Sequence, residues 1–230
     1  MENNKKKSLI PKAALIKAWL IWETFPQTCY NYERMMGQVV AHMFSAIIGF
    51  LYKDDPSKRK EVMKREIEFF NVHIEFGSCI LGMAVALEEQ KAMGENIPGE
   101  FITNLKTSLM GPLAGMGDTI WQGVVIPILL AVCIDLTRSG SGNVWGAVIY
   151  AVVIVVAAYA LSYWNFMFGY KAGSEAIMDF LEKGILNKLI KGASIMGCMV
   201  MGGLIVNYVK VKCGITISTS GSDFSLQESL

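Results

Sequence analysis

The chain has 230 residues, of which 53% are hydrophobic and 18% are charged, and its mean hydropathy is +0.39. This composition excludes a disordered chain, a fibrous chain and a small disulfide-stabilised scaffold. The net charge of +1 gives no support for nucleic-acid binding, which needs a basic field to displace counterions. A large soluble fold and a membrane protein remain, and the distribution of charges decides between them.

The N-terminal residues predict a helix that lies either on the membrane surface or in a soluble layer. Residues 1–8 are polar, and no cleavable secretory signal follows them. Residues 11–24 place Leu15, Trp19 and Trp22 at helical spacing among lysines. This pattern is typical of an amphipathic helix on the cytoplasmic leaflet, and equally of a helix packed in a soluble layer.

The next segments mix apolar runs with clear boundaries. Residues 35–52 and 76–87 are rich in apolar side chains, and core, re-entrant and membrane helices all remain open for them. Asp55-Pro56 predicts the start of a helix, with Asp55 as its N-cap. Residues 94–99 (GENIPG) predict a loop.

Three later segments predict membrane crossings. Residues 144–161 lie in a stretch without any charge from Arg138 to Lys171, and a helix that is apolar all round has no polar face for water. Residues 120–134 and 192–209 are the other two candidates. We therefore expect an all-α membrane protein, a helical bundle with about three or more transmembrane helices.

The placement of lysine and arginine predicts the orientation. Basic side chains crowd residues 53–65 and fill residues 171–191, whereas residues 137–143 hold one arginine. Because positively charged loops stay in the cytoplasm, we expect a cytoplasmic N-terminus, an external loop at residues 139–143 and a cytoplasmic loop at residues 171–191. The chain after residue 209 is then expected outside.

Residues 110–120 (MGPLAGMGDTI) carry the densest signal. Gly111, Gly115 and Gly117 allow unusual backbone angles, and Pro112 removes a donor, so we expect a re-entrant glycine-rich hairpin. Asp118 at the edge of an apolar run is a functional candidate. The alternative is a surface turn that Asp118 caps.

Two other polar clusters, a face of small residues and the cysteines and histidines lie elsewhere in the chain. Residues 30–36 (YNYERMM) and 68–73 (EFFNVH) set polar groups among aromatic ones, for binding a polar ligand or for tying helices together. Ser194, Cys198 and Gly202 form a small-residue face for helix packing. The five cysteines and two histidines indicate no disulfide, metal site, cofactor or catalytic residue.

These segments resemble, in this order, the IID component of the mannose/fructose/sorbose family of the bacterial sugar phosphotransferase system. The resemblance rests on the motifs YNYERM (30–35), EFFN (68–71), ALEEQKA-GENIPG (86–99), LMGPLAGMGD (109–118) and KGASIMG (191–197). Relatives carry a further apolar C-terminal region, so a short member is expected. The expected organisation is a region 1–118 ending in the glycine-rich motif, a transmembrane region 119–209 and a polar tail 210–230.

The resemblance implies a multi-pass subunit of the bacterial inner membrane, embedded in lipid. It pairs with a IIC membrane subunit, in a trimer of IIC–IID heterodimers, to move a hexose or amino sugar. IIA and IIB phosphocarrier proteins supply the phosphoryl group, so IID itself is not the phosphorylated subunit. Planar polar groups suit sugar hydroxyls, and the substrate-binding candidates are Asn31, Glu33, Asn71, Asp118 and Gln122. Gly111, Pro112, Gly115 and Gly117 would form the gate.

Two other functions stay open. The chain could be a structural membrane subunit or a truncated inactive paralogue. A remote alternative is an intramembrane aspartyl protease of the GxGD type, because Gly115 to Asp118 reads GMGD. That chemistry needs two carboxylates that share a proton, and Asp135 lies about five helical turns, roughly 25 Å, from Asp118.

Overall fold

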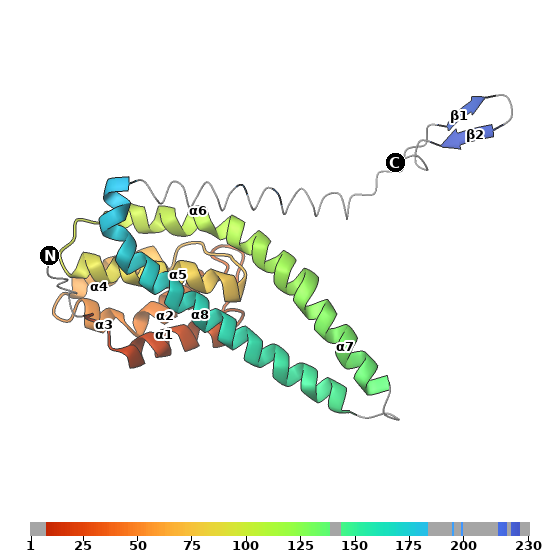
Figure 1. The fold of residues 1–230 in the computed structure, drawn as a ribbon. Coiled ribbons are helices and arrows are strands. Elements are labelled where there is room, and N and C mark those ends of the chain that lie inside the picture. The colour runs from red at the N-terminus through yellow and green to blue at the C-terminus, as the bar shows by residue number, and fades with distance from the viewer. Residues whose placement is uncertain are drawn as a thin grey trace.

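The structure is a computed structural model that describes residues 8–138, 144–183, 195, 199, 216–219 and 222–225. The described residues are mostly helical (Figure 1). The helices are α1 (Lys12–Thr24), α2 (Gly37–Ser45), α3 (Ile48–Leu51), α4 (Pro56–Glu66), α5 (Ile74–Ala92), α6 (Gly99–Gly117), the π-helix η1 (Asp118–Val125), α7 (Ile126–Arg138) and α8 (Trp145–Lys183). The strands β1 (Thr216–Thr219) and β2 (Ser222–Ser225) pair in antiparallel register within the expected tail.

The helix α5 is the centre of the fold and contacts α1, α3, α6 and α8. Its residues Ile80, Leu81 and Ala84 are fully buried. Of the environments left open for residues 76–87, the structure therefore shows the core helix. Residues 35–52 form α2 and α3, whose Met43 and Phe44 are also fully buried.

The first helix is packed against the protein along one face. Trp22 donates from Nε1 to Oγ of Ser78 at 3.0 Å, and Trp19 donates from Nε1 to Oγ of Ser162 at 2.9 Å. The face predicted from Leu15, Trp19 and Trp22 is thus the packed one. The N-cap predicted at Asp55 is confirmed, because its carboxylate accepts from the backbone N of Lys58 at 3.0 Å.

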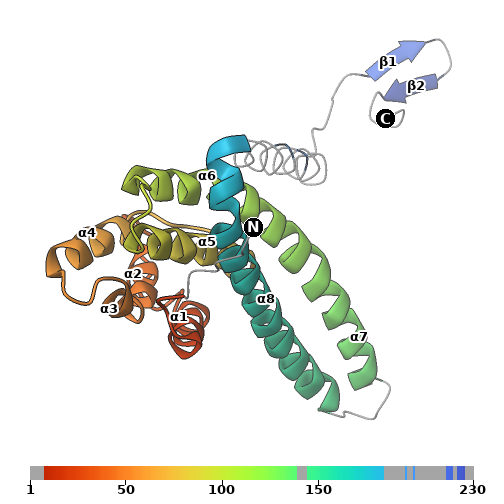
Figure 2. The ribbon, with the colours of Figure 1, turned by 60° about the vertical axis from the view of Figure 1, so that its left-hand side comes forward.

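Within the described residues, two helical runs are long and apolar enough to cross a membrane, Gly99–Thr137 and Trp145–Gly173. In the most apolar 18 residues of each run, 11% are buried. Large apolar side chains such as Ile128 and Val156 therefore face outward, as expected where lipid replaces water. Figures 1 and 2 show α7 and α8 leaving the other helices together as a long pair. Residues 192–209 lie almost wholly outside the described part, as do residues 139–143.

The prediction of an all-α membrane fold is confirmed, but the prediction of a re-entrant hairpin at residues 110–120 is wrong. Helix α6 continues through Pro112 and the glycines to Gly117, η1 follows directly, and α7 follows η1. A helix satisfies its backbone groups internally, which an apolar environment strongly favours over an open turn, and membrane helices tolerate glycine and proline. The departure from an α-helix instead comes just after the glycines, in η1.

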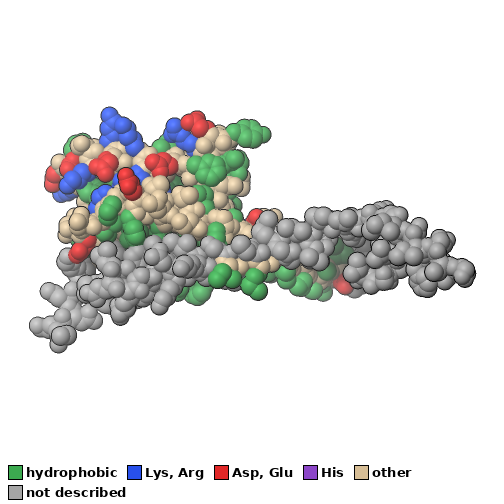
Figure 3. Space-filling model, turned by 90° about the horizontal axis from the view of Figure 1, so that it is seen from above, with side chains coloured by type: hydrophobic (Ala, Val, Ile, Leu, Met, Phe, Trp, Pro, Cys, Tyr) green, Lys and Arg blue, Asp and Glu red, His purple; other side chains and the backbone are tan. Residues whose placement is uncertain are grey.

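Charged side chains concentrate on the N-terminal helices. Figure 3 shows Lys, Arg, Asp and Glu side chains gathered over this block, with apolar side chains along the neighbouring edge. Beneath that surface, a buried network joins α4, α5 and α6. Lys106 contacts Glu66 at 2.8 Å, and Arg65 Nε contacts Glu88 at 3.0 Å. These contacts tie the three helices together.

Candidate functional site

A cavity of about 580 Å³ lies where the loop before α2, the start of α5 and the α6–η1 junction meet. Its polar lining side chains are Gln27, Tyr30, Asn71, His73, Glu75, Asp118 and Gln122, and Trp121 adds an aromatic wall. The segments that supply them are distant in sequence, so the fold assembles this polar surface.

The π-helix supplies one wall of the cavity. In a helix with i→i+5 hydrogen bonds, a turn takes more residues than in an α-helix, so Asp118 and Gln122, four residues apart, lie near one face. Both line the cavity, and Trp121 beside them is 8% exposed. Isolated π-helical turns occur frequently at functional sites.

Asn71 is held in place from two sides. Phe70 bridges Met35 as an isolated β-pair, and its carbonyl accepts from the N–H of Met36 at 2.8 Å. The hydroxyl of Tyr30 donates to Oδ1 of Asn71 at 3.0 Å. The motifs at residues 30–35 and 68–71 therefore meet in space at the cavity.

The other two substrate-binding candidates lie in a neighbouring cavity of about 720 Å³. Oδ1 of Asn31 accepts from the backbone N of Glu33 at 3.1 Å and of Arg34 at 2.9 Å, and its Nδ2 donates to the carbonyl of Cys29. The Asn31 amide thus shapes its own loop. The structure brings Asn71, Asp118 and Gln122 together in the first cavity. It places Asn31 and Glu33 in the neighbouring cavity.

His73 and Glu75 line the first cavity but are absent from the candidates named above from sequence. Nδ1 of His73 lies 3.0 Å from Oε2 of Glu75, an ion-pair distance without hydrogen-bond alignment. A Cβ added at Gly117 would lie 2.3 Å from the His73 ring, so Gly117 permits the contact of α6 with that ring. The signal in the sequence is their position at the start of the apolar helix α5: His73 is its N-cap, and Glu75 lies in its first turn.

Glu23 lies near this pair. Burial raises the pKa of Glu23 to about 7, a hydrogen bond with Ser162 lowers it in part, and the nearby Glu75 carboxylate raises it further. One carboxylate oxygen of Glu23 is buried without a hydrogen-bond partner among the described residues. A carboxyl group here is therefore favoured in its protonated form.

This raised pKa predicts a stability that falls as the pH rises. A carboxyl group whose pKa is about 7 folded and near 4.5 unfolded stabilises the fold below pH 4.5, and that contribution is lost as the pH rises through 7. We expect Glu23→Gln to remove up to about 3 kcal/mol of pH dependence. Thermal unfolding in detergent from pH 5 to pH 8 measures this, with the exposed Glu33→Gln as the control. An equal slope in wild type and Glu23→Gln would contradict it.

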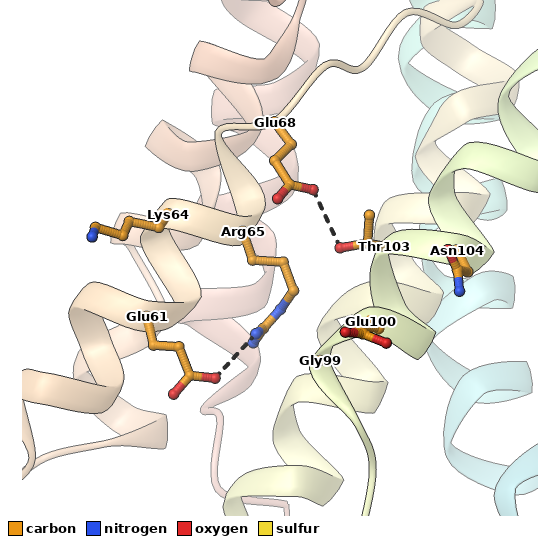
Figure 4. A pocket seen from close by; sticks show the side chains of 8 residues that line it. All are labelled: Glu61, Lys64, Arg65, Glu68, Gly99, Glu100, Thr103 and Asn104. Carbon is orange, nitrogen blue, oxygen red and sulfur yellow. Dashed lines mark hydrogen bonds and ion pairs between the residues drawn. The ribbon is translucent and has the colours of Figure 1, made fainter.

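A further cavity of about 520 Å³ lies between α4 and α6 (Figure 4). Several of its polar groups already bind one another: Arg65 contacts Glu61 at 3.3 Å, and Thr103 donates to Glu68 at 3.3 Å. It holds none of the candidate residues, and we therefore take the cavity at Asn71, Asp118 and Gln122 as the candidate site. Within the described ranges, no three His, Cys, Asp or Glu side chains are arranged to hold a metal ion.

The geometry does not favour an aspartyl protease. Asp118 begins η1 and Asp135 lies near the end of α7, in one continuous helical run. Their separation of roughly 25 Å along that run prevents them from sharing a proton.

Comparison with known proteins gives a consistent result. Residues 9–230 match the family described as "PTS system mannose/fructose/sorbose family IID component". The chain is 36% identical to the mannose-specific EIID component of Escherichia coli K12 over 84% of this chain and 67% of that protein. It is 32% identical to the fructose permease IID component of Bacillus subtilis, over 93% of this chain and 76% of that one.

Solved structures resemble it as well. A chain in the cryo-EM structure of the mannose transporter ManYZ with microcin E492 has a TM-score of 0.79 and 32% identity, covering 92% of this chain and 76% of that chain. A second structure, described as a membrane protein, has a TM-score of 0.66 at 32% identity, covering 91% of this chain and 75% of that one.

Proposed function

Because the chain belongs to the mannose/fructose/sorbose IID components of the sugar phosphotransferase system, we propose that it forms a sugar-translocating unit with a IIC subunit in the bacterial inner membrane. The unit would take up a hexose or amino sugar that IIA and IIB phosphorylate, in trimers of IIC–IID heterodimers. The chain would cross the membrane several times with its N-terminus in the cytoplasm. Its two apolar helical runs and its likeness to a mannose transporter chain support this.

The cavity supplies groups suited to a sugar. The side chains of Asn71 and Gln122 offer an amide donor and acceptor each, and Asp118 offers a carboxylate that accepts from two hydroxyls. Trp121 and Tyr30 add aromatic surface for the apolar face of the ring. Polar groups that converge on one cavity beside apolar and aromatic side chains are typical of small-molecule sites.

One observation carries the assignment: the fold brings Asn71, in the segment between α4 and α5, to the same cavity as Asp118 and Gln122 on η1. In this proposal Asn71, Asp118 and Gln122 contact the sugar. Asn31 and Glu33 shape and line the adjoining cavity, and the segment from Gly111 to Gly117 with Pro112 carries the site on a helix that moves as the gate.

The test is uptake of labelled mannose, fructose and sorbose by cells that lack their own IID protein and express this chain with its IIC partner. We expect Asp118→Asn to lower uptake at least tenfold, because hydrogen bonds to a charged group contribute about 1.5–3 kcal/mol. Gln122→Ala should lower uptake severalfold, because a hydrogen bond to a neutral amide contributes about 0.5–1.5 kcal/mol. Asn104→Ala is the matched control, since Asn104 is polar, exposed and on α6 but outside this cavity.

Membrane extracts must show equal amounts of each variant bound to IIC. If Asp118→Ala and Asn31→Ala both leave uptake and sugar phosphorylation unchanged, the site assignment is wrong. Normal assembly with IIC, together with no sugar-dependent change in any variant, would instead identify a purely structural subunit.

A further inference from the structure

The second cavity, lined by residues 29–34 and Gln38, holds groups that the first site does not use. Tyr32 stands on its rim with 97% of its surface exposed, and the Glu33 side chain is 79% exposed. The guanidinium of Arg34 lies 3.4 Å from the Glu33 carboxylate. An aromatic face beside a carboxylate, a guanidinium and an amide is a surface of the kind that binds a polyhydroxylated ring.

The loop that carries these side chains is rigidly held. Three hydrogen bonds of the Asn31 amide fix its turn, and Met35 donates from its N–H to the carbonyl of Asn31 at 2.8 Å. Met35 has φ +50°, a conformation that residues other than glycine rarely adopt and that clusters at functional sites. The loop is pinned to Phe70 as well. Tyr32 is thus exposed on an ordered support.

Tyr30 is the wall between the two cavities, because it lines both. Its hydroxyl donates to Oδ1 of Asn71, which is one of the groups proposed to contact the sugar. Tyr30 is itself 45% exposed, so packing does not lock its ring in place. Its hydroxyl and a sugar hydroxyl would therefore compete for the same acceptor.

We propose that the second cavity is an outer subsite for the same hexose, and that Tyr30 is the partition which the sugar passes to reach Asn71, Asp118 and Gln122. The sugar first rests on Tyr32, with its hydroxyls on Glu33, Arg34 and Gln38. It then replaces the Tyr30 hydroxyl at Asn71. This inference rests on the sugar-binding function proposed above and adds a route and a competitor to it.

The competition makes an unusual prediction for Tyr30→Phe. The variant keeps the ring but frees Oδ1 of Asn71, so the sugar no longer has to displace an existing hydrogen bond. We expect equilibrium binding of the sugar to tighten between about twofold and tenfold. Tyr32→Ala removes the outer platform and should slow sugar association severalfold while changing the final affinity less.

The experiment uses the full chain purified with its IIC partner in detergent, and mannose, fructose and sorbose as probes. Equilibrium dialysis gives the affinity, and stopped-flow mixing gives the association rate. Phe50→Ala is the control for Tyr32→Ala, since Phe50 is 49% exposed and lines neither cavity. Both Tyr variants keep the fold, because one retains its ring and the other removes an exposed side chain.

The outcomes separate the two proposals. Binding of none of the three sugars by the wild type would overturn the proposed function and this inference together. Sugar binding that Tyr30→Phe weakens or leaves unchanged would overturn the partition alone. An association rate for Tyr32→Ala equal to that of Phe50→Ala would overturn the outer subsite. Tighter sugar binding by Tyr30→Phe together with slower association for Tyr32→Ala would support both the partition and the outer subsite.

Discussion

Replacing Lys106 by methionine is expected to lower the free energy of unfolding by about 3–5 kcal/mol. Lys106 is 3% exposed, and its Nζ lies 2.8 Å from Oε2 of the fully buried Glu66. The other carboxylate oxygen of Glu66 has no hydrogen-bond partner among the described residues. Methionine fills the volume of lysine but leaves Glu66 as a buried charge whose nearest cation is Arg65, at 3.8 Å.

The buried carboxylate of Glu88 increases the destabilisation expected from Lys106→Met. Burial and the Glu66 carboxylate raise the pKa of Glu88, and Arg65, which binds Glu88, opposes them. Without Lys106, one guanidinium must serve both buried carboxylates. The loss therefore reaches α4, α5 and α6 together, since Glu66, Glu88 and Lys106 lie on these three helices.

Thermal unfolding of the purified chain in detergent measures this prediction, with an expected fall in Tm of roughly 10 °C. The double variant Lys106→Met/Glu66→Leu should recover most of the stability, because replacing both partners of a buried pair by apolar groups is often neutral. Glu61→Gln is the control and should cost less than about 1 kcal/mol, since the Glu61 side chain is 61% exposed. A Tm of Lys106→Met within 2 °C of the wild type would contradict the prediction.

The helices were predictable where one physical signal dominates. The uncharged run before Lys171 predicted α8, and the Asp55-Pro56 pair predicted the start of α4, because charge exclusion and capping act locally. The environment of residues 76–87 remained open, since an apolar run reads alike in a protein core and in lipid. Its burial is set by α6 and α8, whose positions periodicity does not specify.

In the glycine-rich segment, by contrast, the local sequence signal predicted the wrong structure. Glycine and proline each lower helix propensity, so local rules favoured a hairpin at residues 110–120. The structure has a helix, because an apolar environment penalises unpaired backbone more than it penalises these residues. The site followed the same pattern: polar residues at motif positions were identified, but their division between two cavities depends on how the Tyr30 loop folds against Phe70.

Replacing Gly82 by alanine is expected to destabilise the chain by about 1–3 kcal/mol or more, because it forces α5 and α8 apart. A Cβ at Gly82 would lie 2.1 Å from the carbonyl oxygen of Phe166 and 2.7 Å from the backbone N of Tyr170. On the facing helix, a Cβ at Gly169 would lie 2.0 Å from the carbonyl oxygen of Cys79. These are backbone atoms of the opposite helix, which cannot turn aside as a flexible side chain can.

Gly82→Ala and Gly169→Ala should therefore each lower Tm, and the double variant should lower it by less than the sum, because one separation of the helices relieves both clashes. Gly111→Ala and Gly115→Ala are matched controls on α6: among the described residues, no atom outside the local helix lies within 4 Å of either added Cβ. Alanine there should leave Tm unchanged or raise it, since glycine costs about 1 kcal/mol in a helix. Thermal unfolding of the isolated chain in one detergent compares all five variants. Equal Tm values for Gly82→Ala and Gly111→Ala would show that the close contact between α5 and α8 does not limit stability.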